Sequence, residues 1–174
     1  KVWDAMAADA RCPVYDMHVE GDAAGSALDF SAWSQGVEAL AWIVDAAELE
    51  RTLAAAVAFA PHVQVVADGP VDAALLAIAE GKASATRQQL GVAMPVQRYG
   101  QRAVAARLQS DLAHAGVARQ WFRSPDVLAL LPFDRPVPGQ CYGLVWSVPD
   151  ARADELLALD DAAFEQALAD ATAG

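Results

Sequence analysis

The sequence is poor in the side chains that bind metals or nucleic acids. Its two cysteines, Cys12 and Cys141, lack the spacing of a zinc site or a redox motif, and its three histidines, His18, His62 and His114, have no second ligand at a metal-binding spacing. We therefore expect no metal site, and we interpret both cysteines as free, buried or half-buried thiols. Twelve basic residues against 23 acidic ones leave a net charge of −11. This charge argues against nucleic-acid binding, because phosphate contacts need clustered Lys and Arg.

Long apolar runs are also missing. No stretch approaches the roughly 20 residues needed to cross a bilayer, and the residues after Lys1 lack the basic and apolar pattern of a secretory leader. We therefore expect a soluble, cytoplasmic protein. The chain begins with Lys1 rather than methionine, so we expect either that a segment was removed or that the chain is cut from a longer polypeptide.

The sequence does contain a succession of strand and helix patterns, starting with a hairpin. After a helical stretch at residues 2–8, apolar and polar side chains alternate over residues 14–20 and again around Leu28 and Phe30, with turn residues 21–26 between them. An isolated hairpin is at best marginally stable in water. We therefore expect this hairpin to join a larger sheet formed by later strands.

A helix is predicted after a strand at residues 39–44. Asp45 and Glu48 have capping-box spacing, and Pro61 ends the helical pattern. The apolar positions follow helical periodicity and predict an amphipathic helix with one apolar stripe. These positions are Leu49, Leu53, Ala56 and Val57.

Short elements are predicted in the middle of the chain. Apolar residues 63–66 and 74–79 are strand candidates, separated by the turn sequence Asp-Gly-Pro at residues 68–70. Ser84 is placed to cap a short helix, and Gly91 stands where a C-terminal glycine is expected.

The second half predicts an antiparallel meander. Four strand candidates, residues 99–110, 117–123, 127–133 and 142–148, follow one another with turn sequences between them, and a helix ending near residue 171 closes the chain. This helix begins at about residue 151 or 160. The predicted fold is α+β, with helices packed on a mixed, mostly antiparallel sheet.

Several motifs along the chain occur in a recognisable order. An apolar strand ends in Glu80-Gly81 and is followed by Ser84 and Arg87. Further motifs are Tyr-Gly-Gln at residues 99–101, a His-led aromatic strand at 114–122, Leu-Leu-Pro at 130–132, Val-Trp-Ser at 145–147, and a helix with an acidic start and an inward Phe164. In this order they resemble the FAD-dependent aromatic hydroxylases of ubiquinone biosynthesis, the 2-polyprenylphenol hydroxylase-like family. Glu80 departs from the Asp usual in that family.

The resemblance covers nearly the whole chain and has consequences for its organisation. It implies that residues 1–37 and 97–174 form a substrate-binding sheet domain and that residues 38–96 are a remnant of an FAD-binding domain. The longer enzyme (the parent enzyme) would be a monooxygenase of quinone biosynthesis that uses FAD and NAD(P)H to hydroxylate a phenol or polyprenylphenol-like substrate. The family's Gly-x-Gly-x-x-Gly turn is absent here, and its late Gly-Asp motif would fall after Gly174. We therefore expect the chain alone to bind no FAD and to be inactive.

The resemblance assigns Glu80, Gly81 and Arg87 to FAD binding. Glycine allows a close backbone approach to a ligand. The alternatives are a plain strand-to-helix turn for the first two residues, and pairing with nearby carboxylates for Arg87. No catalytic residue is assigned, because in this family the cofactor performs the oxygen chemistry.

The resemblance also assigns substrate-binding candidates on the meander strands. These are Gln101, Gln120, Phe122, Leu131, Pro132, Tyr142 and Trp146. The two glutamines are the strongest, because a polar side chain within a strand needs a partner. For Phe122, Leu131 and Trp146, packing in the core is the favoured alternative. The sequence leaves open which strand face lines the pocket.

Other functions and partners stay open on sequence alone. The chain is either part of such an enzyme, or a stand-alone degenerate domain that keeps a hydrophobic-ligand pocket without catalysis, or an interaction domain. The parent enzyme would bind an aromatic small molecule and associate peripherally with a membrane. We expect the chain itself to form a homodimer, because removal of a flavin domain would uncover apolar surface at residues 48–60 and 75–79.

Overall fold

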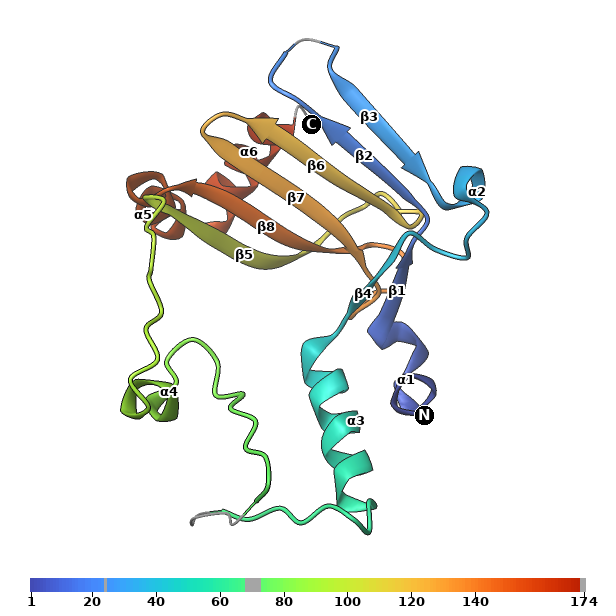
Figure 1. Cartoon of the computed structure of the whole chain (residues 1–174). Helices are drawn as coiled ribbons and strands as arrows, with labels where there is room; N and C mark the ends of the chain where they lie inside the picture. The colour runs from blue at the N-terminus through green and yellow to red at the C-terminus, as the bar shows by residue number, and fades with distance from the viewer. Residues whose placement is uncertain (24, 68–72, 173–174) are drawn as a thin grey trace. The chain divides into compact units, whose positions relative to one another are not determined.

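The computed structural model describes residues 1–23, 25–67 and 73–172 (Figure 1). It divides into two compact units, which we call the sheet unit (residues 1–59 and 100–174) and the middle unit (residues 60–99). The sheet unit includes residues 38–59, which the resemblance assigns to an FAD-domain remnant. Among the described residues, no helix is both long and apolar enough to cross a membrane.

The main sheet of the sheet unit has six strands in the order β3-β2-β6-β7-β8-β5. Their bounds are Asp16–Glu20 (β2), Ala27–Ser31 (β3), Gln101–Gln109 (β5), Val117–Arg123 (β6), Asp126–Phe133 (β7) and Cys141–Pro149 (β8). All neighbours pair antiparallel except β2 and β6, which run parallel. The predicted hairpin therefore joins the predicted meander, and the α+β fold with a mixed, mostly antiparallel sheet is confirmed.

A second, two-stranded sheet contacts strand β7 of the main sheet. Its strands β1 (Arg11–Val14) and β4 (Ala41–Val44) pair antiparallel. Helix α1 (Val2–Ala5) and a 3-10 turn (Ala8–Ala10) precede β1, and helix α3 (Ala46–Ala58) follows β4.

The predicted start of helix α3 is confirmed. The Glu48 backbone N–H donates to Asp45 Oδ1 at 3.1 Å. Arg51 and the Ala7 backbone N–H bind the Glu48 carboxylate and lower its pKa to about 2. Two residues of its apolar stripe, Leu53 and Val57, are exposed. Periodicity marks an apolar face, but another element has to cover that face before it becomes core.

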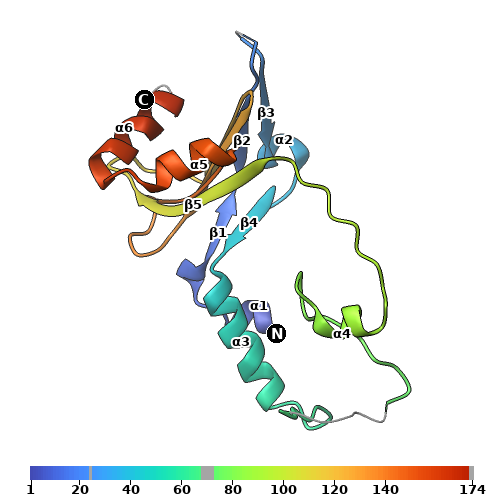
Figure 2. The same cartoon turned by 90° about the vertical axis from the view of Figure 1, so that its left-hand side faces the viewer.

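Two helices at the end of the chain pack on one face of the main sheet (Figure 2). They are α5 (Asp150–Leu157) and α6 (Asp161–Thr172), so the expected single helix is corrected to two. Asp160 Oδ1 accepts the Ala163 backbone N–H at 2.9 Å and thereby caps α6 as a separate helix. A short helix α2 (Ala32–Gln35), ended by Gly36 at φ 64°, was not predicted.

The core lies between this helix pair and the main sheet. It contains side chains of alternating strand positions together with helix residues: Val104, Trp121, Leu128, Leu144, Trp146, Val148, Ala153 and Leu156. Phe164 and Leu168 of α6 pack against it.

The middle unit has one short helix among its described residues, α4 (Ala85–Gln89). The predicted cap is confirmed, because Ser84 Oγ accepts the Arg87 backbone N–H at 3.1 Å. The strands predicted at residues 63–66 and 74–79 are wrong, since neither segment is a strand. A short apolar run becomes a strand only where another strand completes its hydrogen bonds. The turn predicted at residues 68–70 lies outside the described residues.

Candidate functional site

The two faces of the main sheet are covered differently. Helices α5 and α6 pack on one face, which we call the helix face. Side chains of the other parity form the open face, where Phe30, Phe122 and Val145 have 47%, 40% and 41% of their surface exposed. Figure 1 looks onto the open face, with α6 partly hidden behind the strands, and Figure 2 shows both helices on the opposite side. The open face is therefore a large, mostly apolar surface.

One row of directly paired residues crosses the open face from edge to edge. From β5 to β3 the row consists of Ala105, Val145, Ala129, Gln120, Val19 and Leu28. Gln120 is its only polar member. This side chain is half-buried. Among the described residues no hydrogen-bond partner of its amide is found, whereas Gln101 Nε2 donates to the Pro125 carbonyl at 2.9 Å.

Small residues flank this row on β8 and β5, the second and third strands from Gln120. Ala103 and Ser147 pair in one flanking row, and Gly143 pairs with Leu131 in the other. A Cβ added at Gly143 would meet no atom within 4 Å. The β5 and β8 side of the open face thus has small side chains, and the Gln120 amide lies two strands from β8.

The structure places the predicted substrate residues on both faces. Gln101, Gln120, Phe122 and Leu131 have open-face parity, whereas Pro132, Tyr142 and Trp146 have helix-face parity. One pocket on one side of the sheet cannot contain both sets.

Trp146 and Tyr142 are engaged by the protein itself. Trp146 is 2% exposed, and its Nε1–H donates to Asp126 Oδ2 at 3.3 Å. The Tyr142 ring lies edge-on to His114, with 5.7 Å between ring centroids. Burial raises the pKa of Tyr142, and the charge of Arg119 partly opposes this rise. The core interpretation therefore holds for Trp146.

The predicted FAD-binding residues form a closed turn within the middle unit. The Glu80 carboxylate accepts hydrogen bonds from Ser84 Oγ at 2.8 Å, from the Thr86 backbone N–H at 3.0 Å and from the Thr86 hydroxyl. These bonds, led by the Thr86 hydroxyl, lower the pKa of Glu80. Gly81 has φ +75°, which favours glycine.

Arg87 closes the same turn from the other side. Its guanidinium donates to the carbonyls of Gly81 at 3.3 Å and Lys82 at 2.7 Å. It thus pairs with backbone carbonyls rather than with the carboxylates considered from sequence. The polar groups assigned to FAD are used by the turn, which matches the alternative of a plain turn before a capped helix.

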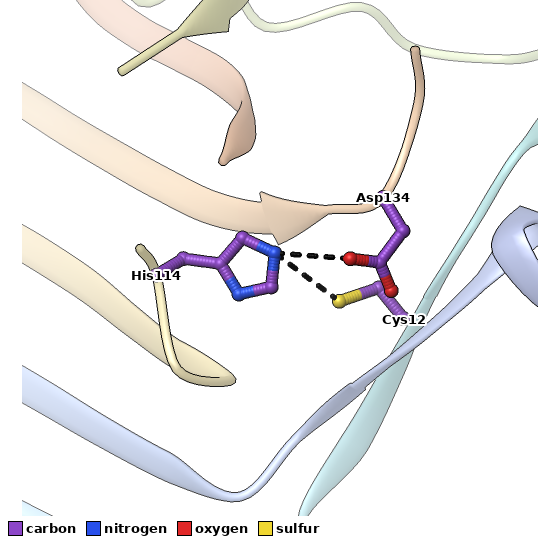
Figure 3. Close-up of side chains that lie close together, drawn as sticks. All are labelled: Cys12, His114 and Asp134. Atoms are coloured by element: carbon purple, nitrogen blue, oxygen red, sulfur yellow. Dashed lines mark hydrogen bonds and ion pairs between the residues drawn. The ribbon is translucent and has the colours of Figure 1, made fainter. Parts of the chain in front are cut away.

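A cluster that the sequence did not predict lies in the sheet unit (Figure 3). Cys12, His114 and Asp134 bring one potential ligand atom each to within 4.8 Å of the others. His114 Nε2 lies 3.2 Å from Asp134 Oδ1 and 4.0 Å from Cys12 Sγ. The expectation that His114 stands alone is therefore wrong. Cys12 and His114 are 102 positions apart, so no sequence spacing could have revealed the contact.

The hydrogen bonds of the cluster do not suit metal binding. The Gly116 backbone N–H donates to His114 Nδ1 at 3.0 Å, so in the neutral ring the proton is on Nε2 and points toward Asp134. A metal at Nε2 needs the opposite tautomer, in which Nδ1–H donates to an acceptor. The residues present therefore do not fit a metal ligated through Nε2.

Nucleophilic catalysis is also a poor match for this cluster. A catalytic triad places the nucleophile and the carboxylate at opposite ring nitrogens, whereas here both lie at Nε2. Burial, reinforced by Asp134, raises the pKa of Cys12 to about 12, so its thiol is protonated at neutral pH. Asp134 Oδ1 also accepts the Gly139 backbone N–H at 2.8 Å. The contacts of the cluster hold β1 against two loops of the main sheet, one containing His114 and the other containing Asp134.

A cavity of about 350 Å³ lies between the helix face and the two C-terminal helices. Its lining includes Trp121, Trp146 and two arginines. Both arginines are already paired, Arg123 with Glu20 at 2.7 Å and Arg152 with Glu155 at 2.9 Å. Among the described residues that line it, the cavity therefore offers no free cation to an anionic ligand.

No protein-family model matches the chain. Of the sites described above, the open face alone combines accessible apolar surface with a half-buried polar group that the protein leaves available.

Proposed function

We propose that this chain is the substrate-binding part of an FAD-dependent aromatic hydroxylase, and that its open face holds the aromatic substrate. The observation that supports this most directly is the row through Gln120, which is apolar except for one amide. An aromatic ring buries its faces against apolar side chains, at about 25 cal/mol per Å². A ring hydroxyl needs a polar partner at the same place. Gln120 offers both a donor and an acceptor.

The length of the apolar row supports a substrate with a prenyl tail. The row crosses all six strands of the main sheet, which corresponds to about 24 Å at a strand spacing of about 4.8 Å. Beyond Gln120 it continues over Val19 and Leu28 to the edge strand β3. A phenol head at the centre and a prenyl chain toward β3 would both contact apolar side chains.

The cofactor belongs to the parent enzyme in this proposal. Flavin supplies oxygen activation when bound, with NAD(P)H as the reductant. The residues present in this chain do not fit FAD by themselves, because Arg87 is bound to two carbonyls and Glu80 is a carboxylate held within its own turn. The role of this chain is therefore to bind and orient the ring and to exclude water from it.

Methyl NMR tests the proposal on the protein as it stands. Titration with 2-prenylphenol is expected to shift the methyl signals of Val145, Ala129 and Ala105 on the open face. Val148 is the matched control, because it lies on the same strand as Val145 but is 0% exposed on the helix face. Shifts centred on Val148 and Leu144, or no shifts at all, would count against the open face as the site.

The runner-up is a stand-alone domain that binds a hydrophobic ligand without catalysis, and the same exposed face favours it. The gene upstream of Lys1 separates the two functions. A coding region for a Gly-x-Gly-x-x-Gly turn in the same reading frame supports the enzyme. Phenol binding without that region supports the stand-alone domain.

A further inference from the structure

We propose that the Gln120 amide selects ligands that carry a hydroxyl group on the aromatic ring. Gly143, which has no side chain, leaves room for that ring. This inference rests on the proposed function, since it assigns the selectivity of the same open face. Gln120 would then distinguish a phenol from a hydrocarbon of the same shape.

The side chains next to Gln120 cannot form a hydrogen bond with its amide. Val19 and Ala129 are its direct partners on the two adjacent strands, at Cβ separations of about 5 Å. Phe122, two positions along the same strand, has open-face parity as well. None of these side chains has a hydrogen-bonding group, so the amide is free to turn toward a ligand.

Charged groups are held away from this amide. Arg107 is on the open face, but its guanidinium is bound to Asp45 at 3.3 Å and lies over the Phe133 ring. Gln101 is held by the Pro125 carbonyl. The Gln120 amide is thus available to form a hydrogen bond with a substituent on the ligand's ring.

An apolar ring over Gln120 would cover the amide without replacing its hydrogen bonds to water. A phenol hydroxyl replaces one of them, because it donates to the amide oxygen or accepts from the amide N–H. Sites built to hydrogen-bond a hydroxyl discriminate against analogues that lack it. For one half-buried neutral hydrogen bond we expect a preference of about 3- to 10-fold.

Gly143 leaves room on β8, two strands from the Gln120 amide. Its position pairs with Leu131 on β7 and Arg107 on β5. It lies two strands across and one row along from Gln120, about 12 Å away by strand geometry, so a ring whose hydroxyl reaches the amide extends toward it. The backbone there lies outside the left-handed region, and an added Cβ meets nothing within 4 Å. A larger side chain at this position is therefore compatible with the fold, and it would stand where the ring lies.

The experiment compares two ligands that differ by one hydroxyl group, 2-prenylphenol and prenylbenzene. Dissociation constants are measured from the Val145 methyl shift for the wild type and for Gln120→Leu, Gly143→Leu and Gln166→Leu. Gln166 is exposed on α6, beyond the helix face, and is the matched control. Backbone amide spectra of each variant verify that the fold is retained.

The wild type and Gln166→Leu are expected to bind 2-prenylphenol about 3- to 10-fold more tightly than prenylbenzene. Gln120→Leu is expected to bind both alike, and to bind prenylbenzene more tightly than the wild type does, because no amide is then covered without a partner. Gly143→Leu is expected to weaken the binding of both ligands by a similar factor.

Equal binding of the two ligands by the wild type would overturn the selection by Gln120 and leave the proposed function standing. Selectivity that persists in Gln120→Leu would do the same. Unweakened binding by Gly143→Leu would overturn the role of Gly143. Failure of the wild type to bind either ligand at millimolar concentration would refute the proposed site itself and this inference with it.

Discussion

Arg107 Nη2 lies 3.3 Å from Asp45 Oδ2, across 62 positions of sequence. Asp45 is buried and caps α3, and Arg135 is a second cation near the same oxygen at 3.8 Å. The Arg107 guanidinium stacks on Phe133, 4.7 Å from the ring centroid. The Asp45 carboxylate thus links the start of helix α3 to Arg107, which lies on the open face of the main sheet.

Asp45→Ala is expected to reduce the free energy of unfolding by about 2 kcal/mol, through the lost cap and the lost ion pairs. Asp160→Ala is the control, because Asp160 caps α6 from an exposed position. Its loss should cost about 0.5–1 kcal/mol. Urea denaturation measures both variants. Equal losses would mean that Arg107 and Arg135 add nothing to the cap.

The assignment of the two sheet faces is tested by a pair of aromatic substitutions. Trp146→Ala should cost about 3–5 kcal/mol, because it removes a core side chain and leaves a cavity. Phe122→Ala should cost less than about 1 kcal/mol, because this side chain is 40% exposed on the open face. Denaturation curves with similar midpoints for the two variants would contradict the face assignment.

Alkaline pH is expected to destabilise the protein through Cys12. The pKa of its thiol is about 12 in the fold against 9.0 for an unperturbed thiol. Above the unfolded pKa the thiol ionises only in the unfolded chain, so stability is full below that pH and falls as pH rises toward the folded pKa. The stability difference between wild type and Cys12→Ala should change with pH over this window. The raised pKa of Tyr142 contributes to the loss of stability in the same direction. Tyr142→Phe therefore measures this second contribution separately.

The chain alone is expected to bind FAD at best in the millimolar range. It lacks the Gly-rich turn that binds the pyrophosphate, and the net charge of −11 repels a dianionic cofactor, although salt screens this repulsion within about 8 Å. A few weak contacts correspond to millimolar affinity. The purified protein should be colourless, and flavin fluorescence should stay unquenched at micromolar protein. A yellow preparation would instead favour a compact flavin or quinone binder.

Self-association is expected through apolar side chains on α3. Leu53 and Val57 are one helical turn apart and exposed, and Phe59 just beyond the helix is 88% exposed. Apolar patches of this kind are commonly covered by partners. Light scattering should show a homodimer that Leu53→Glu converts to a monomer and that Ala55→Glu, on the opposite side of the helix, leaves intact. A monomeric wild type at high concentration would contradict the expectation.

Features that depend on near neighbours in the chain were predictable from sequence. The Asp45 and Ser84 caps each involve a backbone N–H three residues away, and the alternation around Met17 reflects the period of a strand. The bounds of β6 were predicted without error, because turn sequences flank a clear strand pattern. The strands expected at residues 63–66 and 74–79 failed because local apolarity does not supply a pairing partner.

The candidate sites were decided by tertiary structure. Phe122 and Trp146 belong to similar strand patterns, yet the docking of α5 and α6 buries one and leaves the other exposed. Cys12, His114 and Asp134 come from three separate segments that only the fold brings together. Sequence determines which side chains alternate and where elements begin, because those preferences are local. Which face is covered, and which distant groups meet, depends on contacts between elements far apart in the chain.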